Sequence, residues 1–419
     1  MLDQPKFRAL QGASDQAEVK RIWREVGWIT DAQCDKALEL GFSAGNWAVA
    51  EVSGGVECSV QTVAGTMALK RTPLPTCVVA AVTTGRLGRG QALAQRLTAR
   101  QVALAAMQGD AVATLGMFDQ GFYDKLGFGT GGYTQEFQID PGALDVPYPS
   151  SQPQRLTMQD HAAMHAALST HPRNHGSVSI PSPAFFYSHL AFEEESNFGL
   201  GFYTDSVLTH FIWLRPKGEN GPYFVRWMGY QNGAQLIELL GLLRSLADQV
   251  YAIALMEPPE IQLQSILQRP FRHMQTTKHS DFAGRQKVDA WYQLRILDIP
   301  QCVAAIVWQG TPAKFVLDVT DPIETILRDQ AVADSVSWFG VAGHYLVELG
   351  ATSKATRIDA TDAAAAPVMR CSVNALSRLL WGVNLPSYLP NSDDLQAPAS
   401  LLLALDPIFA ERPHPFWVY

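Results

Sequence analysis

The sequence predicts an α/β protein whose last part is a separate α+β domain. Short apolar runs such as TCVVAAVTT (residues 76–84) alternate with segments whose apolar residues recur at helical spacing. At 419 residues the chain is too long for one ordinary domain. A proline-rich connection at 146–153 and a polar stretch at 275–286 mark two boundaries. We therefore predict three domains, at residues 1–148, 149–285 and 286–419.

The first predicted domain begins with helices, one of them capped by Ser14 or Asp15 and ended by Gly27. Two strands separated by glycines predict a hairpin over about 46–69, and residues 76–84 predict a buried central strand. A glycine loop and a helix from Gln91 to about Met107 follow. The strand AVATLGM, the short helix in FYDKLGFG and the strand YTQEFQID complete this domain, the last strand at residues 133–140.

The second predicted domain repeats this order of elements. A helix over 158–168 precedes the strands HFIWLRP and PYFVRWMGY and a helix with leucines on one face. Its strand-to-helix loop, YQNGAQ at 230–235, has no counterpart of the RLGRG stretch of the first domain. The third domain mixes strands (KFVLDVT, HYLVELG) with helices (SVNALSRLLWG, ASLLLAL), which indicates an α+β fold.

Composition excludes several classes of protein. With 47% hydrophobic and 17% charged residues the chain can build sizeable cores, which excludes intrinsic disorder. A net charge of −8 argues against nucleic-acid binding, which depends on basic patches. The five cysteines lie far apart, which indicates reduced thiols. The sequence has no signal-peptide pattern and no run of roughly 18 apolar residues, so we expect a cytoplasmic protein that does not bind membranes.

The stretch VTTGRLGRGQA, residues 82–92, is the chemical centre of the first domain. Glycines between a strand and a helix let backbone N–H groups approach an anion, and the helix N-terminus adds partial positive charge. Arg86 and Arg89 add formal charge. A turn that only reverses the chain is the alternative. The loop is neither a Walker loop nor a Rossmann GxGxxG loop.

The order of strand, glycine loop, helix, strand and GFYDKLGF (121–128) resembles the GNAT N-acetyltransferases. Their pyrophosphate loop reads R/Q-x-x-G-x-G/A, which aligns with residues 87–92. Gly90 and Ala92 match, whereas Leu87 stands where the family has Arg or Gln, next to Arg86. The resemblance implies acetyl-CoA as a co-substrate, no metal, and a pantetheine that pairs with residues 80–82 like an added strand. The cofactor-binding residues that it implies are Ala80, Ala81, Val82, Gly88, Arg89, Gly90, Gln91, Ala92, Leu93, Phe118 and Asp119.

The whole chain resembles the Eis-type (enhanced intracellular survival) acetyltransferases, whose third domain is similar to sterol carrier proteins. The stretches ELLGLLRSLADQ (238–249) and SVNALSRLLWG (372–382) support this resemblance. It implies two tandem GNAT-like domains, the second without a CoA loop, followed by a sterol-carrier-like α+β domain. It also implies a homohexamer.

The resemblance assigns Tyr123, in GFYDKLGF, the role of the acid that protonates the departing thiolate. An ordinary tyrosine pKa near 10 suits an acid that must stay protonated at neutral pH yet can protonate a thiolate of pKa about 8.5. A packed core tyrosine with a satisfied hydroxyl is the alternative.

The chain ends in RPHPFWVY, residues 412–419, although most chains end in a few polar residues. In Eis-type enzymes the C-terminal carboxylate reaches the active site, and here it belongs to Tyr419. An α-carboxyl near 3.5 and an alkyl ammonium near 10.4 differ by about 7 pKa units, or roughly 9 kcal/mol. Burial must therefore raise the pKa of the carboxyl or lower that of the amine, or else the carboxylate only orients the ammonium. A terminal strand docked for stability is the alternative.

We expect an acetyl-CoA-dependent N-acetyltransferase that acts by direct transfer on a small-molecule or peptide amine. As the resemblance implies, the acceptor is an aminoglycoside-like polyamine or a lysine side chain, which the acidic net charge fits. The alternative is a lipid carrier or scaffold with a vestigial acetyltransferase layer, which Leu87 supports.

Two other features carry weaker signals. The pairs His161/His165 and His171/His175 have HxxxH spacing but no HExxH glutamate, so we expect no metal there. The run Glu193, Glu194 and Glu195 is a solvated acidic face, or else it gathers a polycationic substrate.

Overall fold

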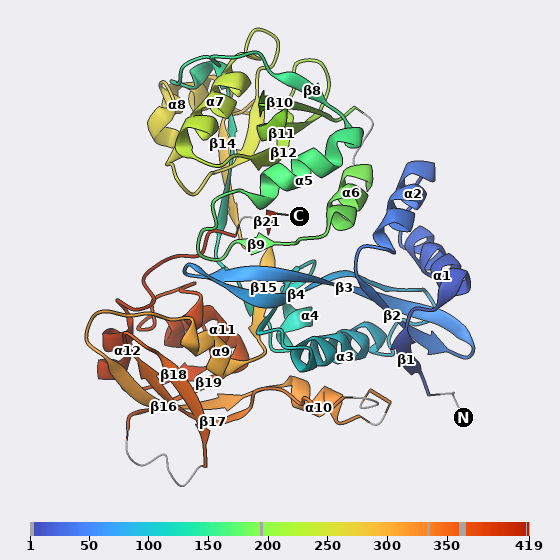
Figure 1. The fold of residues 1–419 in the computed structure, drawn as a ribbon, viewed down its shortest axis with the longest axis vertical. Helices are drawn as coiled ribbons and strands as arrows, with labels where there is room; N and C mark the ends of the chain where they lie inside the picture. The colour runs from blue at the N-terminus through green and yellow to red at the C-terminus, as the bar shows by residue number, and fades with distance from the viewer. Residues whose placement is uncertain are drawn as a thin grey trace.

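A computed structural model describes residues 4–192, 196–329, 331–332, 336–359, 366–415 and 417–418. Among these residues the strands form three sheets (Figure 1). The first sheet lies in the middle of the molecule, the second at the top, and the third at the lower left of the view. In the same part of the chain, no helix has both the length and the apolar character that crossing a bilayer requires.

The first sheet has nine strands in the order β1-β2-β3-β4-β5-β15-β6, with β9 and β21 joined to the end of β3 that extends beyond β2. Its strands are β1 (Lys6–Ala9), β2 (Asn46–Val52), β3 (Gly55–Leu69), β4 (Thr72–Thr84), β5 (Val112–Gly116), β6 (Gly129–Thr130), β9 (Val178–Ser179), β15 (Tyr292–Ile296) and β21 (Trp417–Val418). Its helices are α1 (Gly12–Glu25), α2 (Ala32–Gly41), α3 (Leu93–Met107) and α4 (Gln120–Asp124).

The second sheet has the order β14-β7-β13-β12-β11-β10-β8. Its strands are β7 (Thr134–Ile139), β8 (Gln154–Leu156), β10 (Phe198–Thr204), β11 (Val207–Pro216), β12 (Tyr223–Gly229), β13 (Ile253–Met256) and β14 (Arg285–Asp289). The associated helices are α5 (His161–Ser169), α6 (Pro183–Phe192), α7 (Gly233–Arg244), α8 (Pro270–Thr276) and the 3-10 turns η1 (Pro141–Ala143), η2 (Met158–Asp160) and η3 (Leu263–Ile266).

The third sheet has the order β18-β17-β16-β19-β20. Its strands are β16 (Ala313–Thr320), β17 (Gly343–Leu349), β18 (Lys354–Ile358), β19 (Val368–Ser372) and β20 (Leu395–Gln396). Helices α9 (Ile299–Ala304), α10 (Ile323–Leu327), α11 (Val373–Leu380), α12 (Ala399–Leu405) and the turn η5 (Leu389–Asn391) accompany them. The strands and helices predicted for this region are therefore present.

Two helices begin at other residues than the sequence predicts. Helix α1 starts at Gly12, and Asp15 lies inside it, because its carboxylate binds the Arg8 guanidinium and the Gln11 N–H instead of capping the helix. Helix α3 starts at Leu93 rather than Gln91, because Ala92 has a left-handed φ of 53°.

The sheets do not follow the three predicted segments. Strand β7, which the sequence places last in the first domain, pairs with β13 and β14 of the second sheet. Strand β15, placed in the third domain, pairs with β5 and β6 of the first sheet. All five residues of β15 are buried, so this strand gains its stability from packing between two faces rather than from its neighbours in sequence.

A buried ion pair joins β15 to the third sheet. Arg295 Nη2 lies 2.5 Å from Asp321 Oδ2, and both side chains have no exposed surface. Asp321 also accepts hydrogen bonds from the backbone N–H groups of Ile323 (3.2 Å) and Val341 (2.9 Å). A charge left alone in such a place is strongly unfavourable, so each partner depends on the other.

Removing Asp321 should therefore destabilise the protein. We expect Asp321→Ala to lower the free energy of unfolding by about 3–5 kcal/mol, because it leaves Arg295 charged and buried. Urea denaturation followed by fluorescence measures this loss. The control is Glu348→Ala, which removes an exposed partner of Lys314 and should leave the midpoint almost unchanged. Similar midpoints for the two variants would contradict the prediction.

Candidate active site

Strand β4 bends away from its neighbours at a bulge. Its register with β3 shifts between Ser59↔Thr83 and Gln61↔Ala80, so β4 carries one residue more than β3 over this stretch. Ala81 lies in the bulge with a φ of 53°, which a residue with a Cβ rarely adopts. Bulges of this kind occur beside active sites because they redirect one strand.

The bulge opens one edge of β4. Strands β4 and β5 pair in parallel only from Thr76↔Val112 to Val79↔Leu115. On its other side β5 pairs with β15 from Val112 to Gly116, where β5 ends. The predicted residues Ala80, Ala81 and Val82 are half-buried, and no described strand pairs with their β5-facing edge. An extended chain can bind there by strand addition.

The glycine loop presents unpaired N–H groups next to this edge. Gly85 N–H donates to the Glu57 carbonyl (2.8 Å) and Gly88 N–H to the Gly85 carbonyl (3.2 Å). From Arg89 to Gln95, by contrast, no backbone N–H donates to any residue that the structure describes, and helix α3 has no side-chain cap. Donors without described partners at the positive end of a helix are suited to binding an anion.

Glycine is required at two positions of this loop. A Cβ atom at Gly88 would lie 2.9 Å from both the Glu57 carbonyl oxygen and Leu93 Cδ1, so the loop packs closely on β3. Gly90 has a φ of 76°. Leu87, which departs from the family pattern, is 78% exposed. Arg86 is exposed, and its guanidinium lies 3.5 Å from the Glu25 carbonyl.

Tyr123 lies where β4 and β5 separate. It is 2% exposed and belongs to the same apolar cluster as Val79 and Leu115. Its ring contacts Phe122 (centroids 4.8 Å apart) and Phe118 (5.6 Å). No described residue forms a hydrogen bond with its hydroxyl, and burial raises the pKa of this group.

The two other predicted residues of this region have different surroundings. Asp119 caps α4, because its Oδ1 accepts a hydrogen bond from the Gly121 N–H at 2.9 Å. Phe118 is 71% exposed. The structure thus brings Phe118, Asp119 and Tyr123 together at one end of β5.

The end of the chain joins the first sheet. Strand β21 pairs in parallel with β9, and β9 pairs with β3 at Thr66 and Met67 (Figure 1). The preceding residues are fixed by hydrogen bonds from His414 N–H to the His175 carbonyl (2.7 Å) and from Arg412 to the Gly382 carbonyl (3.2 Å). Tyr419, the predicted base, and Phe416 lie outside the described residues, as do Glu193, Glu194 and Glu195.

Glycines make room for this tail. Pro413 is buried against Gly132 and Gly176, and a Cβ atom added at either glycine would lie 2.7 Å from it. A cavity of about 130 Å³ separates the tail from the second sheet, and it is lined by Tyr133, Tyr230, Glu257, His414 and Pro415 among others. This cavity could not be predicted from the sequence, since its walls come from distant segments.

His175 connects three parts of the molecule. Its Nδ1 accepts a hydrogen bond from the Lys70 N–H (2.9 Å), and its Nε2 donates to the Trp381 carbonyl (3.1 Å). These partners assign a neutral ring with its proton on Nε2. Burial lowers the pKa of His175, and it lowers that of His171 to about 4. Among the described residues no three His, Cys, Asp or Glu side chains are grouped as metal ligands.

Comparisons with known proteins agree on the fold. No protein-family model and no curated protein matches the sequence. A GCN5-related N-acetyltransferase from Anabaena variabilis is 15% identical, with 99% of each chain covered and a TM-score of 0.76. Eis1 from Mycobacterium abscessus is 18% identical, with 99% of this chain and 100% of that chain covered and a TM-score of 0.75.

A further solved structure gives the same result. A conserved protein of unknown function from Enterococcus faecalis V583, a probable N-acyltransferase, is 14% identical, with 99% of this chain and 98% of that chain covered and a TM-score of 0.76. The chain therefore has the fold of GCN5-related N-acetyltransferases, and the predicted likeness to Eis proteins and the α/β class are confirmed.

The neutral state of His175 makes stability depend on pH. Its pKa in the folded state is lower than the ordinary value near 6.5, so below about pH 6.5 the unfolded chain binds more protons and stability falls. His175→Gln keeps a donor and an acceptor but does not titrate. As the pH falls below about 6.5, this variant should lose less free energy of unfolding than the unmodified protein. The difference should be up to about 1.4 kcal/mol per pH unit.

Urea denaturation at several pH values between about 7.5 and 5 measures this slope. The matched control is His279→Gln, since His279 is exposed. A slope that His175→Gln leaves unchanged would show that His175 does not carry this pH dependence.

Proposed function

We propose that the protein is an acetyl-CoA-dependent N-acetyltransferase that acts on primary amines. One observation carries the proposal. Three groups lack a described partner: the N–H groups of residues 89–95, the edge of β4 at residues 80–82, and the hydroxyl of Tyr123, whose side chain is in one apolar cluster with Val79 and Leu93. This set offers one site for a phosphate group, one for an extended chain and one for a proton transfer.

Acetyl-CoA fits these three parts in order. The pyrophosphate would accept hydrogen bonds from the N–H groups of residues 89–95, with the exposed Arg89 adding charge. The pantetheine arm would pair with residues 80–82 of β4. The thioester would then lie beside Tyr123, since this arm runs toward the point where β5 ends.

The reaction joins the amine nitrogen to the acetyl carbon and breaks the carbon–sulfur bond. A neutral amine attacks the thioester carbonyl, and the nitrogen gives up a proton as the tetrahedral intermediate collapses. Tyr123 donates its hydroxyl proton to the departing thiolate. Its raised pKa keeps that proton in place until the thiolate forms, and a thiolate in the same apolar surroundings is itself more basic than in water.

We assign the base to the C-terminal carboxylate of Tyr419. Strand β21 supports this role because it brings the chain end into the first sheet. Strands β9 and β3 separate β21 from β4, so the carboxylate would act across the face of the sheet. An aminoglycoside-like polyamine or a lysine side chain is the acceptor that this acidic protein fits best. The sterol-carrier-like third domain, the homohexamer and the cytoplasmic location stay predictions.

Acetyl-CoA should stabilise the folded protein. At 100 times its Kd it would add about 2.7 kcal/mol and raise Tm by several degrees. Gly90→Val should abolish this shift, because a β-branched residue strains the loop at a φ of 76° while its Cβ meets no neighbour within 4 Å. Differential scanning fluorimetry measures both.

The matched control is Gly218→Val, at a φ of 80° in the β11–β12 turn with equally open surroundings. It should retain the acetyl-CoA shift. A shift with a fatty acid and none with acetyl-CoA would favour the carrier function over the enzyme.

Tyr123→Phe should lower kcat by about 10²–10⁴ with little change in KM, because only the proton donor is lost. Steady-state release of free CoA thiol measures this. The control is Tyr345→Phe, at a buried tyrosine whose hydroxyl donates to the Val341 carbonyl (3.0 Å) in the third domain. An unchanged kcat for Tyr123→Phe would remove Tyr123 from the mechanism.

Moving or neutralising the terminal carboxylate should also lower kcat. We expect at least a tenfold loss when Gly-Ser is added after Tyr419, and a similar loss when the terminus is a carboxamide made by ligation. The same dipeptide added before Met1 is the control. Near-normal kcat in a folded, extended variant would exclude the base role.

A further inference from the structure

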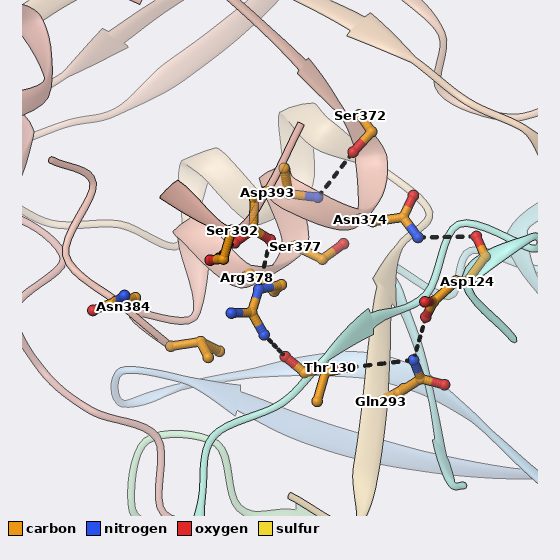
Figure 2. A network of polar contacts seen from close by, with 12 residues as sticks. Asp124, Thr130, Gln293, Ser372, Asn374, Ser377, Arg378, Asn384, Ser392 and Asp393 are labelled. Atoms are coloured by element: carbon orange, nitrogen blue, oxygen red, sulfur yellow. Dashed lines mark hydrogen bonds and ion pairs between the residues drawn. The ribbon is translucent and has the colours of Figure 1, made fainter. Parts of the chain in front are cut away.

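We propose that the third domain positions Tyr123, through four side chains that hold the segment around it. This inference rests on the proposed role of Tyr123 as the acid. The four side chains, called the α4 clasp below, are Gln293 and Arg295 of β15 and Asn374 and Arg378 of α11 (Figure 2 shows all but Arg295). They bind the segment 120–130, which contains α4 and β6.

This segment has little structure of its own. Helix α4 has five residues and β6 has two. The turn between them is closed by hydrogen bonds from the Leu126 and Phe128 N–H groups to the Tyr123 carbonyl, at 2.9 and 3.3 Å. Elements this short do not hold a single conformation without tertiary contacts.

Helix α11 supplies the first contacts. Asn374 Nδ2 donates to the carbonyl of Asp124 at 3.0 Å (Figure 2). It also donates to the carbonyl of Phe128 at 2.8 Å, so one amide bridges both ends of the turn. Arg378 Nη1 donates to the Thr130 carbonyl at 2.6 Å. Asp393 contacts the same guanidinium at 2.7 Å and orients it.

Strand β15 supplies the others. Gln293 Nε2 donates to Asp124 Oδ1 at 2.6 Å, and Arg295 Nη1 donates to the Leu126 carbonyl. Both side chains are fully buried. The buried Asp321 in turn fixes Arg295, so the contact extends into the third sheet.

The segment packs closely against α11 at two glycines. Gly127 has a φ of 82°, and a Cβ atom there would lie 2.7 Å from Val373 Cγ1. A Cβ atom at Gly129 would lie 2.9 Å from Arg378 Cγ. Two glycines therefore allow α11 to contact this backbone directly.

These contacts matter for chemistry because the Tyr123 hydroxyl has no described partner to orient it. Its position depends on the backbone of α4 and on the phenylalanines around the ring. A displacement of about 1 Å of a reacting group can cost 10²-fold in rate. Asn374 is thus a positioning residue for Tyr123 and has no contact with the substrate in this proposal.

A double-mutant cycle tests the proposal. Asn374→Ala should lower kcat about tenfold and leave KM for acetyl-CoA within about twofold. In a Tyr123→Phe background the same substitution should lower kcat no further, because the group that it positions is already absent. Asn220→Ala, which removes an amide-to-carbonyl hydrogen bond (2.9 Å) in the second sheet, is the matched control and should leave kcat unchanged in both backgrounds.

Gln293→Met provides a second cycle, which decides the question if Asn374→Ala fails to fold as judged by circular dichroism. Equal losses of kcat with and without the Tyr123 hydroxyl would overturn the proposal, as would a raised KM with unchanged kcat. If Tyr123→Phe alone keeps full kcat, the proposed acid role fails and the clasp with it. If Tyr123→Phe lowers kcat and the loss from the clasp substitution adds to it, the acid role stands and only the positioning role of the α4 clasp is excluded.

Discussion

The first sheet depends on a strand that comes from far along the chain. Strand β15 fills the space between β5 and β6, and all its residues are buried, including the charged Arg295. That charge is tolerated only because Asp321 lies against it and two backbone N–H groups fix Asp321 in turn. Strand β15 therefore connects the candidate active site to the third domain alongside helix α11, and the ion pair fixes this connection.

The candidate site depends on polar groups that have no hydrogen-bond partner among the described residues. The bulge at Ala81 leaves one edge of β4 open, and the left-handed Ala92 starts α3 two residues later than the helical pattern indicates. Both departures from regular structure expose backbone donors that a regular strand and a capped helix would have used. Tyr123 follows the same rule, since no described side chain binds its hydroxyl.

Local features were predictable because their causes lie within a few residues. The β2–β3 hairpin, the glycine loop and the leucine face of α7 each follow from neighbouring residues, and the structure contains all of them. The exchange of β7 and β15 between sheets was not predictable, because strand pairing depends on partners more than 100 residues away. The contacts of Asn374 with residues 124 and 128 escape sequence reasoning for the same reason.

The exchanged strand also has a consequence for biosynthesis. Strand β5 ends at Gly116 and its partner β15 begins at Tyr292, 292 − 116 = 176 residues later. At about 5–20 residues per second a ribosome needs roughly 10–35 s to cover that distance. During this interval the apolar edge of β5 has no partner from its own chain, and such edges template aggregation. An isolated first domain without β15 would keep the same open edge permanently.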